Sequence, residues 1–374
     1  MKTALVHDWL TSVRGGEKVL DLLCEVLPGS DLYTLLYVKG SQTPRIEQRA
    51  ITTSWLDKLP GVRHYYRWLL PWMPSAASRF DLKGYDLVVA VSHCVAHGVR
   101  VEAPARFVCV CLTPMRYVWD ASDAYFANRG HNLRYGLLSL MRRRFRRWDL
   151  AAARRVGEYI SISRVVEERV RRCYGRASEV IFPPVDVDYF RPVGGAGDYY
   201  LWAGALAPYK RIDLALEAFR RLDRRLVVVG EGQDLKRARR RAPDNVTFLG
   251  RQSDAALREH YSSCRALVFP GEEDFGIVPV EAQACGRPVI AYGRGGVLDT
   301  VVPLGDASGR APTGVFFDSP TPDALAGAVR RFEANAGAFD PAAIRAHAER
   351  FSRERCRMAL TQYLLGSQPR QGSS

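Results

Sequence analysis

The sequence predicts an α/β protein with two doubly wound parallel-sheet domains, and three observations support this. Short, almost continuously apolar runs alternate with segments of helical periodicity, which is typical of parallel strands covered on both faces. The alternation stops at a proline- and glycine-rich segment near the middle of the chain and then begins again. A chain of 374 residues, 47% of them hydrophobic, is also long enough for two cores.

The first domain is predicted to span residues 1–190. Its first strand, residues 3–6, leads through a loop into an amphipathic helix that follows residue 16. Further strands are expected at residues 32–37, 50–53, 87–91, 107–112, 159–161 and 179–182, and further helices at 133–156 and 165–174.

A glycine pair, Gly15 and Gly16, stands where the first loop meets its helix. Two glycines allow backbone N–H groups to approach a phosphate closely. A plain strand-to-helix turn would need the same residues, so the pair alone leaves both interpretations open.

The second domain is predicted to span residues 196–350, after a linker stiffened by Pro183, Pro184 and Pro192. Its expected strands are residues 199–203, 226–229, 246–249, 267–269, 289–291 and 314–317. Its expected helices are residues 212–222, 235–241, 255–262, 277–285, 322–334 and 342–351, and a last helix follows at 355–365 before a polar tail that we expect to be disordered.

Two carboxylates, Glu273 and Glu281, flank a loop-to-helix junction in the second domain. Pro270 and Gly271 end the strand before them, and Gly286 follows the predicted helix. Glu273 should therefore lie at the carboxyl end of a strand and Glu281 near a helix N-terminus, where open α/β sheets bind anionic ligands. A helix cap is the simpler explanation for either carboxylate.

The formal net charge of +14 and a pI near 9.6 indicate an acidic partner: nucleic acid, an anionic membrane surface or a phosphorylated substrate. The sequence shows neither a run long enough to span a membrane nor a signal peptide, so we expect a cytoplasmic protein. The eight cysteines form no CxxC pair and are expected to be buried, reduced thiols.

Two segments of the first domain combine aromatic and basic residues. Residues 55–73 are predicted either to meet a membrane interface or to form a core helix with snorkelling arginines. The run MRRRFRRWDLAAARR, residues 141–155, would normally be a solvated face, but Phe145 and Trp148 make it a candidate for lipid or polyanion contact.

Three loops of the second domain should converge at one edge of its sheet. The loop 204–210 offers Lys210 as a point charge for phosphate, and the loop 230–232 is glycine-rich. The third loop brings Glu273, whose carboxylate can accept hydrogen bonds from hydroxyl groups. A cation, a helix N-terminus and carboxylates together favour a sugar nucleotide as ligand.

These segments resemble the retaining glycosyltransferases of family 4, which have the GT-B fold and an E-x7-E motif, here Glu273 and Glu281. The resemblance covers nearly the full chain and is carried by PYKRID at 208–213, EDFGIVPVEAQACG at 273–286 and LTPMRYVWD at 112–120. It is strongest to bacterial mannosyltransferases that use GDP-mannose to build lipopolysaccharide O-antigen or exopolysaccharide. It implies two Rossmann-like domains that face each other across a cleft, with the helix from about residue 352 packed on the first domain.

The resemblance also implies the role of each matching residue. Glu273 and the backbone amides of residues 275–277 would hold the donor hexose, Glu281 the ribose and Lys210 the diphosphate. The implied catalytic residues are Glu273 and Lys210. The donor-binding residues would be Gly15, Gly16, Gly204, Lys210, Arg211, Gly250, Glu273, Phe275, Gly276, Ile277 and Glu281. The acceptor or sugar side would carry His7, Asp8, His93 and Arg116.

The chain departs from the family at two positions. Ala205 stands where an arginine is common, so Lys210 would carry the diphosphate charge with help from Arg211 or Arg116. Leu112 stands where a histidine near the sugar is common, and His93, His7 or a backbone group would replace it.

The implied reaction proceeds with retention and without a metal ion or cofactor other than the sugar-nucleotide co-substrate. The implied acceptor is a glycan linked to polyprenyl diphosphate, which an enzyme bound peripherally to the inner face of the cytoplasmic membrane could reach through its basic, aromatic first domain. The alternatives are another UDP- or GDP-hexose donor, a sugar-nucleotide epimerase, a phosphorylase-like enzyme and, in another class, a basic nucleic-acid-binding protein, although we expect no nucleic-acid partner.

Overall fold

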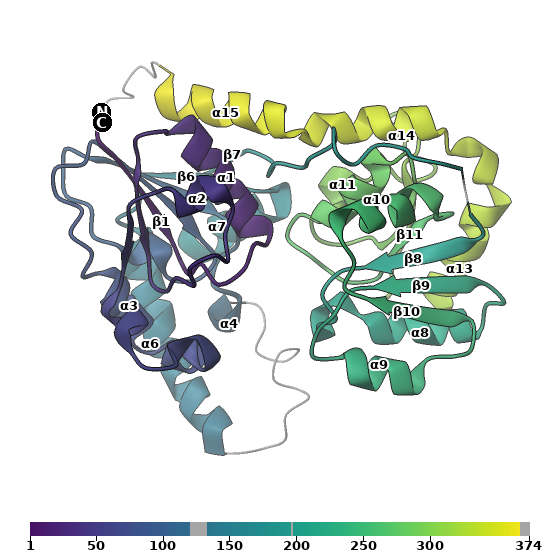
Figure 1. Cartoon of the computed structure of the whole chain (residues 1–374), viewed down its shortest axis with the longest axis horizontal. Helices are drawn as coiled ribbons and strands as arrows, with labels where there is room; N and C mark the ends of the chain where they lie inside the picture. The colour runs from purple at the N-terminus through teal and green to yellow at the C-terminus, as the bar shows by residue number, and fades with distance from the viewer. Residues whose placement is uncertain (120–132, 196, 367–374) are drawn as a thin grey trace. The chain divides into compact units, whose positions relative to one another are not determined.

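The computed structural model describes residues 1–119, 133–195 and 197–366 (Figure 1). The chain divides into two compact units, one formed by Met1–Pro184 together with the segment from Glu354 onward, and the other by Val185–Arg353. Two sequence predictions lie outside the described residues: Asp120, which ends the third motif, and the polar tail from Ser367.

The amino-terminal unit is built on a seven-stranded parallel sheet of order β3-β2-β1-β4-β5-β6-β7. Every residue of β1 and β4 is buried, as expected for central strands covered on both faces. The strands are β1 (Thr3–His7), β2 (Asp31–Thr34), β3 (Ile51–Thr53), β4 (Leu87–Ser92), β5 (Arg106–Cys111), β6 (Glu158–Ser161) and β7 (Glu179–Val180).

Helices and short 3₁₀ turns connect these strands. The α-helices are α1 (Gly15–Val26), α2 (Pro44–Glu47), α3 (Met73–Ala77), α4 (Arg116–Trp119), α6 (Leu133–Ala153), α7 (Arg164–Tyr174) and α15 (Arg353–Leu365). The 3₁₀ helices are η1 (Trp55–Lys58), η2 (Val62–His64), η3 (Tyr66–Leu69) and η4 (Ala96–Gly98).

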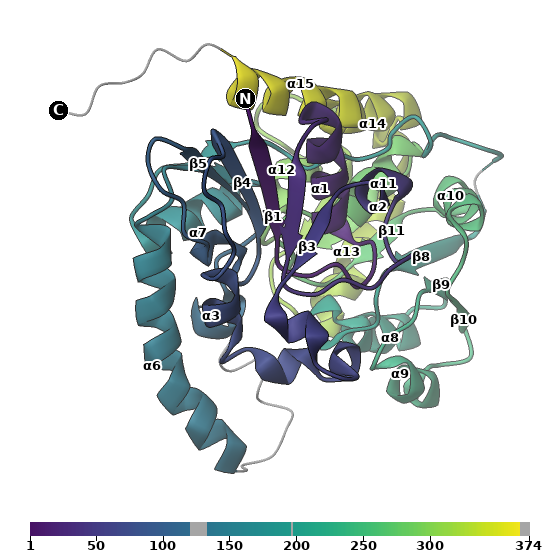
Figure 2. The same cartoon turned by 60° about the vertical axis from the view of Figure 1, so that its left-hand side comes forward.

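The last helix, α15, belongs to the amino-terminal unit and runs beside α1 (Figures 1 and 2). Arg106 of β5 donates hydrogen bonds to the backbone carbonyls of Tyr363 and Leu364 at 3.1 and 3.0 Å. Its Nε is 2.6 Å from a carboxylate oxygen of Glu158. A cation that binds the last carbonyls of a helix satisfies groups that lack helical partners, so Arg106 fixes the end of α15.

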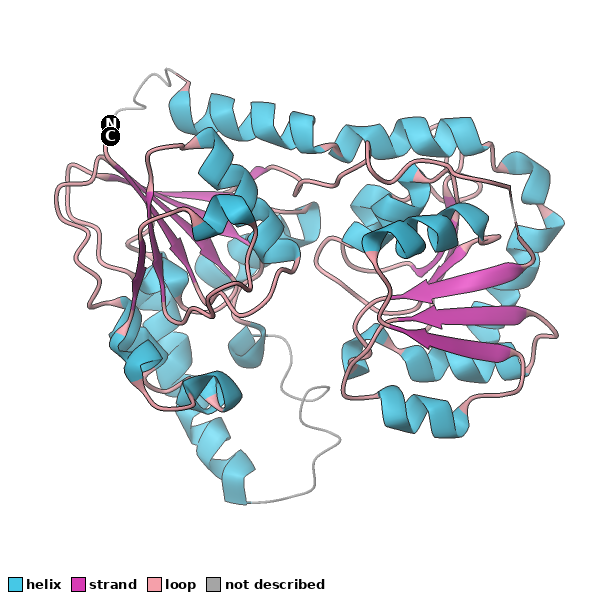
Figure 3. Ribbon diagram, viewed as in Figure 1, coloured by secondary structure: helices cyan, strands magenta, loops and turns pink. Residues whose placement is uncertain are grey.

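The carboxyl-terminal unit is built on a six-stranded parallel sheet of order β10-β9-β8-β11-β12-β13 (Figure 3). Its strands are β8 (Tyr199–Ala203), β9 (Arg225–Val229), β10 (Val246–Gly250), β11 (Leu267–Phe269), β12 (Val289–Tyr292) and β13 (Gly314–Phe317). Its helices are α8 (Ile212–Arg220), α9 (Leu235–Arg241), α10 (Asp254–Ser263), α11 (Ile277–Ala284), α12 (Val297–Thr300), α13 (Pro322–Ala334) and α14 (Pro341–Ala348), with the 3₁₀ turns η5 (Pro208–Lys210), η6 (Ala336–Ala338) and η7 (Glu349–Phe351).

Helices cover both faces of this second sheet. Helices α8, α9 and α13 pack together on one face, and α10, α11 and α14 pack together on the other (Figure 1). Tyr200 and Trp202 point into the core beneath α8 and α13, because alternate residues of a strand face opposite sides of the sheet. The predicted α/β class with two parallel-sheet domains is therefore confirmed.

The first unit ends at Pro184, whereas the linker pattern placed the boundary near residue 190. The Val185 N–H donates to the Phe351 carbonyl, and the Arg353 N–H donates to the Val185 carbonyl, both at 3.0 Å. These backbone bonds hold the end of the linker against the carboxyl-terminal unit, which the local sequence could not indicate.

The aromatic and basic segment 55–73 is not the single core helix that was one of its two interpretations. It forms three short 3₁₀ helices, η1 to η3, and Pro60 and Gly61, whose φ is 66°, interrupt the chain between the first two. Trp68 and Trp72 are 65% and 51% exposed. The exposed rings keep the membrane-interface interpretation open.

The basic run of α6 does not present its aromatic residues as expected. Phe145 is buried, and Trp148 packs so closely on Gly98 that a Cβ on that glycine would lie 2.3 Å from the indole. Four arginines of this helix are exposed, namely Arg143, Arg144, Arg146 and Arg147. Phe145 and Trp148 therefore do not support a lipid or polyanion contact of this run, because both rings pack on the protein itself, and the contact stays a prediction that rests on the arginines.

All eight cysteines are free and buried, as the sequence predicted. Within the described ranges, no helix is long and apolar enough to cross a membrane. The same residues contain no group of three or more histidine, cysteine or acidic side chains arranged to hold a metal ion.

Candidate functional site

In each domain, the predicted site residues lie where the strand order reverses. In the first sheet β2 and β3 lie on one side of β1, and β4 to β7 lie on the other; in the second sheet β9 and β10 lie on one side of β8, and β11 to β13 on the other. Loops leave the carboxyl ends of such central strands in opposite directions, so ligands of open α/β sheets bind there. The residues after β1 and β4, and those after β8 and β11, are therefore the candidates.

Lys210 and Glu273 meet at the switch point of the carboxyl-terminal domain. Lys210 ends the turn η5 after β8, and Glu273 follows the neighbouring strand β11. The Lys210 Nζ forms an ion pair and hydrogen bond with Glu273 Oε1, and the two side chains are 11% and 19% exposed. The structure thus joins the two predicted catalytic residues across adjacent strands.

At Gly271, which lies close to this pair, the neighbouring backbone leaves no room for a side chain. A Cβ on Gly271 would lie 2.7 Å from the Tyr209 carbonyl oxygen and 2.9 Å from the Lys210 Cα. Arg211, the next residue, has a φ of 54°, which is uncommon for a residue with a side chain. The close approach at Gly271 and the left-handed Arg211 together turn the Lys210 side chain toward Glu273.

Glycines also join the loops after β8, β9 and β10. A Cβ on Gly230 would lie 1.8 Å from the Gly204 carbonyl oxygen, so the two loops touch through their backbones. The Gly230 N–H in turn donates to the Gly250 carbonyl at 2.8 Å. The predicted positions Gly204 and Gly250 thus belong to one backbone layer, and Gly204 also lies close to the Lys210 ammonium group.

The loop after β11 leads into α11 through Gly276, whose φ is 89°. Phe275 is buried, and its ring packs on Phe351 at a centroid separation of 5.7 Å, so only its backbone could meet a ligand. Two residues that the sequence reasoning did not include support this loop, namely Gly295 and Gly296. The Gly296 N–H donates to the Glu273 carbonyl at 2.8 Å, and a Cβ on Gly295 would lie 2.4 Å from that oxygen.

Glu281, the second carboxylate of the motif, is buried on α11. Its Oε2 accepts a hydrogen bond of 3.1 Å from the hydroxyl of Tyr261, a residue that the sequence reasoning missed. Burial and the neighbouring carboxylate raise the pKa of Tyr261 well above its usual range, so the phenol stays protonated and donates. The ribose-binding role of Glu281 stays a prediction.

The two arginines proposed to assist Lys210 differ in their surroundings. The Arg211 Nε lies 3.1 Å from an oxygen of Asp213, with which the guanidinium forms an ion pair. Arg116 begins α4, after the strand β5 that lies beside β4. Arg211 would have to leave Asp213 before it could bind a diphosphate.

Asp8 and His93 meet at the switch point of the amino-terminal domain. Asp8 follows β1, is fully buried, and accepts hydrogen bonds from four successive backbone N–H groups, those of His93, Cys94, Val95 and Ala96, at 2.6 to 3.0 Å. Its Oδ2 also lies 3.0 Å from His93 Nδ1. Such a nest of N–H groups holds a carboxylate in its charged form.

The pair has shifted pKa values. Burial raises the pKa of Asp8, but the charge and hydrogen bonds of His93 outweigh it and bring the pKa well below its usual range. Burial lowers the pKa of His93, but the charge of Asp8 and its hydrogen bond raise it above the usual value. The His93 side chain is 31% exposed, and its ring stands edge-on to Trp9 with centroids 4.6 Å apart. Asp8 therefore favours the protonated form of the accessible His93 ring at this edge of the sheet.

His7 is less accessible to a ligand than His93. It is buried, and its Nδ1 lies 3.1 Å from the Val91 carbonyl oxygen, to which it can donate. Its Nε2 lies 3.7 Å from an oxygen of Glu17, beyond hydrogen-bond distance. Of the two histidines that the sequence offered in place of the missing one, His93 is the more accessible.

Gly15 and Gly16 form the start of α1, next to His7. A Cβ on Gly16 would lie 2.7 Å from a methyl carbon of Leu112 and 3.5 Å from the His7 ring. Leu112, which stands at the family's usual histidine position, therefore lies directly against the glycine pair. Glu17, in the first turn of this helix, closes the turn by accepting a 2.9 Å hydrogen bond from the Arg14 N–H.

Comparisons with known proteins agree with this architecture. The structure superposes on HepE of Anabaena in complex with UDP with a TM-score of 0.71 and 16% identity over 97% of this chain and 99% of that one. It superposes on WaaG, a glycosyltransferase involved in lipopolysaccharide biosynthesis, with a TM-score of 0.62 and 16% identity over 98% and 100% of the two chains. The chain has the GT-B fold.

The sequence comparison concerns mainly the carboxyl-terminal domain. Residues 194–352 match the family of glycosyl transferases group 1. The D-inositol 3-phosphate glycosyltransferase of Geodermatophilus obscurus is 35% identical over 211 residues, which are 48% of this chain and 45% of that protein. The GDP-mannose-dependent alpha-mannosyltransferase of Mycolicibacterium smegmatis is 39% identical over 114 residues, 30% and 28% of the two chains. The chain thus spans less than half the length of the curated relatives it matches.

Proposed function

We propose that this chain is a retaining glycosyltransferase that moves mannose from GDP-mannose onto a lipid-linked saccharide in the synthesis of a bacterial surface polysaccharide. The observation that carries the proposal is the ion pair of Lys210 with Glu273 at the β8–β11 switch point, in a domain that matches the glycosyl transferases group 1. The expected cleft between the two domains stays a prediction.

In the proposed reaction, the ion pair of Lys210 and Glu273 opens, and each side chain binds part of the donor instead. Lys210 binds the diphosphate, and Glu273 accepts hydrogen bonds from hexose hydroxyls. The bond from the anomeric carbon to the diphosphate oxygen then breaks, and the acceptor hydroxyl oxygen forms the new bond on the same face of the sugar while its proton passes to the departing diphosphate. Lys210 and the amides at the start of α11 stabilise the charge that develops on the leaving diphosphate, and a metal ion has no assigned role.

Mannose and the guanine nucleotide are proposed from the resemblance and from the mannosyltransferase among the relatives. A thermal-shift panel of GDP-mannose, UDP-glucose, UDP-galactose and UDP-N-acetylglucosamine tests this. We expect GDP-mannose to raise the melting temperature most, because a ligand that binds only the folded state stabilises it by mass action. A larger shift with a UDP-sugar would replace the donor, and conversion of the donor in the absence of acceptor would indicate an epimerase.

Peripheral binding to an anionic membrane is proposed from the segment 55–73. Trp68 and Trp72 are exposed beside the exposed cations Arg63 and Arg67, a combination that suits the headgroup region of a bilayer. The inner face of the cytoplasmic membrane, where a polyprenyl-diphosphate acceptor would be reached, is part of the same proposal.

Flotation with vesicles containing phosphatidylglycerol measures this binding. The double substitution Trp68→Ser and Trp72→Ser is expected to leave most of the protein unbound, because it removes both rings that enter the interface. Leu298→Ser, which alters an equally exposed apolar residue of the other domain, is the control. Retention of duplex DNA at physiological salt without vesicle binding would contradict the membrane proposal and favour a nucleic-acid partner.

A further inference from the structure

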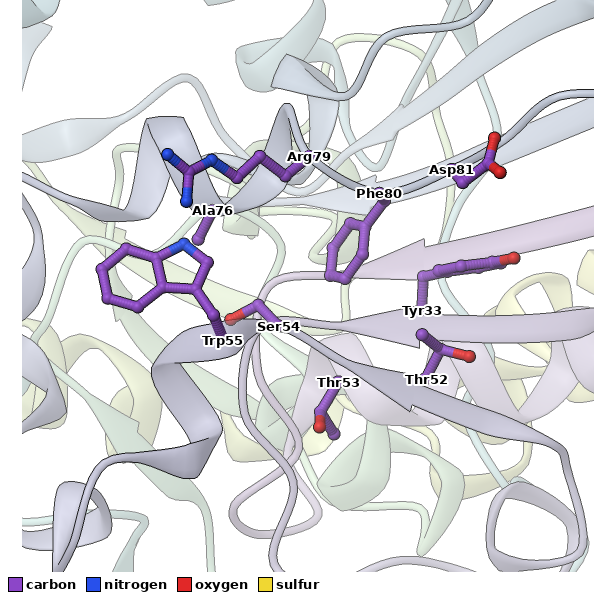
Figure 4. Close-up of a pocket in the computed structure, with 9 residues that line it drawn as sticks. All are labelled: Tyr33, Thr52, Thr53, Ser54, Trp55, Ala76, Arg79, Phe80 and Asp81. Carbon is purple, nitrogen blue, oxygen red and sulfur yellow. The ribbon is translucent and has the colours of Figure 1, made fainter.

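A cavity of about 400 Å³ lies on one face of the amino-terminal sheet, beside its edge strand β3 (Figure 4). Tyr33 of β2 and Thr52 of β3 are paired in register, so their side chains lie side by side on the same face. The chain after α3 closes the other side with Arg79, Phe80 and Asp81. Trp55 and Ala76, near the two ends of the aromatic segment, complete the wall, so this segment projects from the rim of the cavity.

The lining combines aromatic rings with polar groups that have few partners. Figure 4 shows Trp55 and Arg79 at one end, Tyr33 and Thr52 at the other, and Phe80 between them. The Arg79 guanidinium lies 5.9 Å from the centre of the Trp55 ring. Among the residues that the structure describes, it forms no hydrogen bond or ion pair, and the hydroxyls of Thr52 and Thr53 likewise have no hydrogen-bond partner.

These groups match the chemistry of a sugar ring. A pyranose has an apolar C–H face, which packs on aromatic rings, and hydroxyl groups that both donate and accept hydrogen bonds. Arg79 and Asp81 carry opposite charges, so together they favour an uncharged ligand over a phosphate. An acyl chain would leave the Thr52 hydroxyl and the Arg79 guanidinium without partners, which is costly.

The cavity and the Asp8–His93 pair both lie at the carboxyl ends of the strands of this sheet. His7 of β1 is in register with Thr34 of β2, and Thr34 is in register with Thr53 of β3. The ends of β1 and β3 are therefore two strand spacings apart, about 10 Å. A short oligosaccharide can span this distance.

We propose that this cavity is a subsite for a sugar unit of the acceptor glycan, held between Trp55 and Phe80 and hydrogen-bonded to Arg79 and the Thr52 hydroxyl. The inference rests on the proposed glycosyltransferase function. It assigns acceptor recognition to residues outside both switch points.

Titration of the full-length protein with methyl α-D-mannopyranoside and α-linked mannobiose, followed by saturation-transfer NMR, tests this subsite. GDP is kept in excess so that the glycosides do not report on the donor site. Arg79→Ala is expected to weaken glycoside binding about tenfold, because it removes a charged hydrogen-bond donor. Thr52→Trp, at an exposed edge-strand position that tolerates an aromatic residue, fills the cavity and should abolish binding.

Arg100→Ala, which removes an exposed arginine of the same domain outside the cavity, is the matched control and should bind as the wild type does. The absence of glycoside binding to the wild type, or unchanged binding in both cavity variants, would overturn the subsite. A thermal-shift response to sugar nucleotides is recorded for the same proteins and should be equal in all. Glycoside binding without any response to sugar nucleotides would instead overturn the proposed function.

Discussion

Replacing Lys210 by alanine is expected to reduce glycosyl transfer at least about tenfold, and Glu273→Ala is expected to do the same, because each removes a charged contact to the donor. Lys210 is the cation that the proposed function places on the leaving diphosphate, and Ala205 does not supply a second one. Its loss should therefore lower kcat. The proposed function places Glu273 on the sugar, so its loss should affect both kcat and KM.

Steady-state kinetics with the identified donor and acceptor measure both effects. Lys236→Ala, which removes an exposed lysine of the same domain, is the control and should leave transfer unchanged. The double variant should lose less than the sum of the two single losses, because the two side chains are in direct contact. Near-normal turnover in a correctly folded single variant would exclude that residue from the site.

Asp8→Asn is expected to destabilise the amino-terminal domain by about 3 to 5 kcal/mol, because it removes a buried charge that His93 and the nest of N–H groups require. The carboxylate has two oxygens for four backbone donors, whereas an asparagine would turn an NH₂ group toward two of them. Urea denaturation followed by circular dichroism measures the change. Asp57→Asn, which affects a carboxylate that accepts one backbone hydrogen bond, from Tyr37, is the control and should cost only about 1 kcal/mol.

The same pair should make stability depend on pH. The pKa of Asp8 is lowered by folding, so its contribution is present above the unfolded value of about 3.9 and is lost as the pH falls through the lower folded value. The pKa of His93 is raised, so its contribution is complete below about 6.5 and is lost as the pH rises through the higher folded value. The pair therefore stabilises the domain most between about pH 4 and 6.5.

His93→Gln should remove the loss of stability above this range. Asp8 and Glu17 raise the pKa of His93, Arg14 lowers it, and the His7 ring lies 6.3 Å away. Denaturation midpoints measured from pH 5 to 9 would report the difference. An identical pH dependence in the variant and the wild type would exclude His93 as the group that titrates.

Much of the fold could be predicted because its local signals agree. Strands such as β4 and β8 are apolar along almost their whole length, and residues with clear capping roles bound many of the helices. Residues 55–73 were harder, because Tyr65, Trp68 and Trp72 have helical spacing, whereas Pro60 and Gly61, whose φ is 66°, interrupt the segment. The burial of Phe145 and Trp148 could not be predicted for another reason. Both residues stand in a charged run, and only their contacts with the rest of the domain bury them.

The site was predicted less completely than the fold. Glu273 and Lys210 could be named from the loops that carry them, but Tyr261, Gly295 and Gly296 have no local signal of a role. Each supports the site from an element distant in the sequence, through a hydrogen bond or a backbone contact. The role of Glu17 could have been predicted from the sequence. An acidic residue in the first turn of a helix often accepts a hydrogen bond from the backbone N–H at the start of that helix.

The sequence by itself determined the α/β class, the two parallel-sheet domains and the loops that hold the candidate residues. These follow from periodicity, from apolar runs and from glycine and proline, which act over a few residues. Only the tertiary structure decided that Lys210 pairs with Glu273 and Asp8 with His93. Each pair joins two strands that are neighbours in the sheet although 63 to 85 residues separate the partners in the sequence, and such contacts depend on strand order.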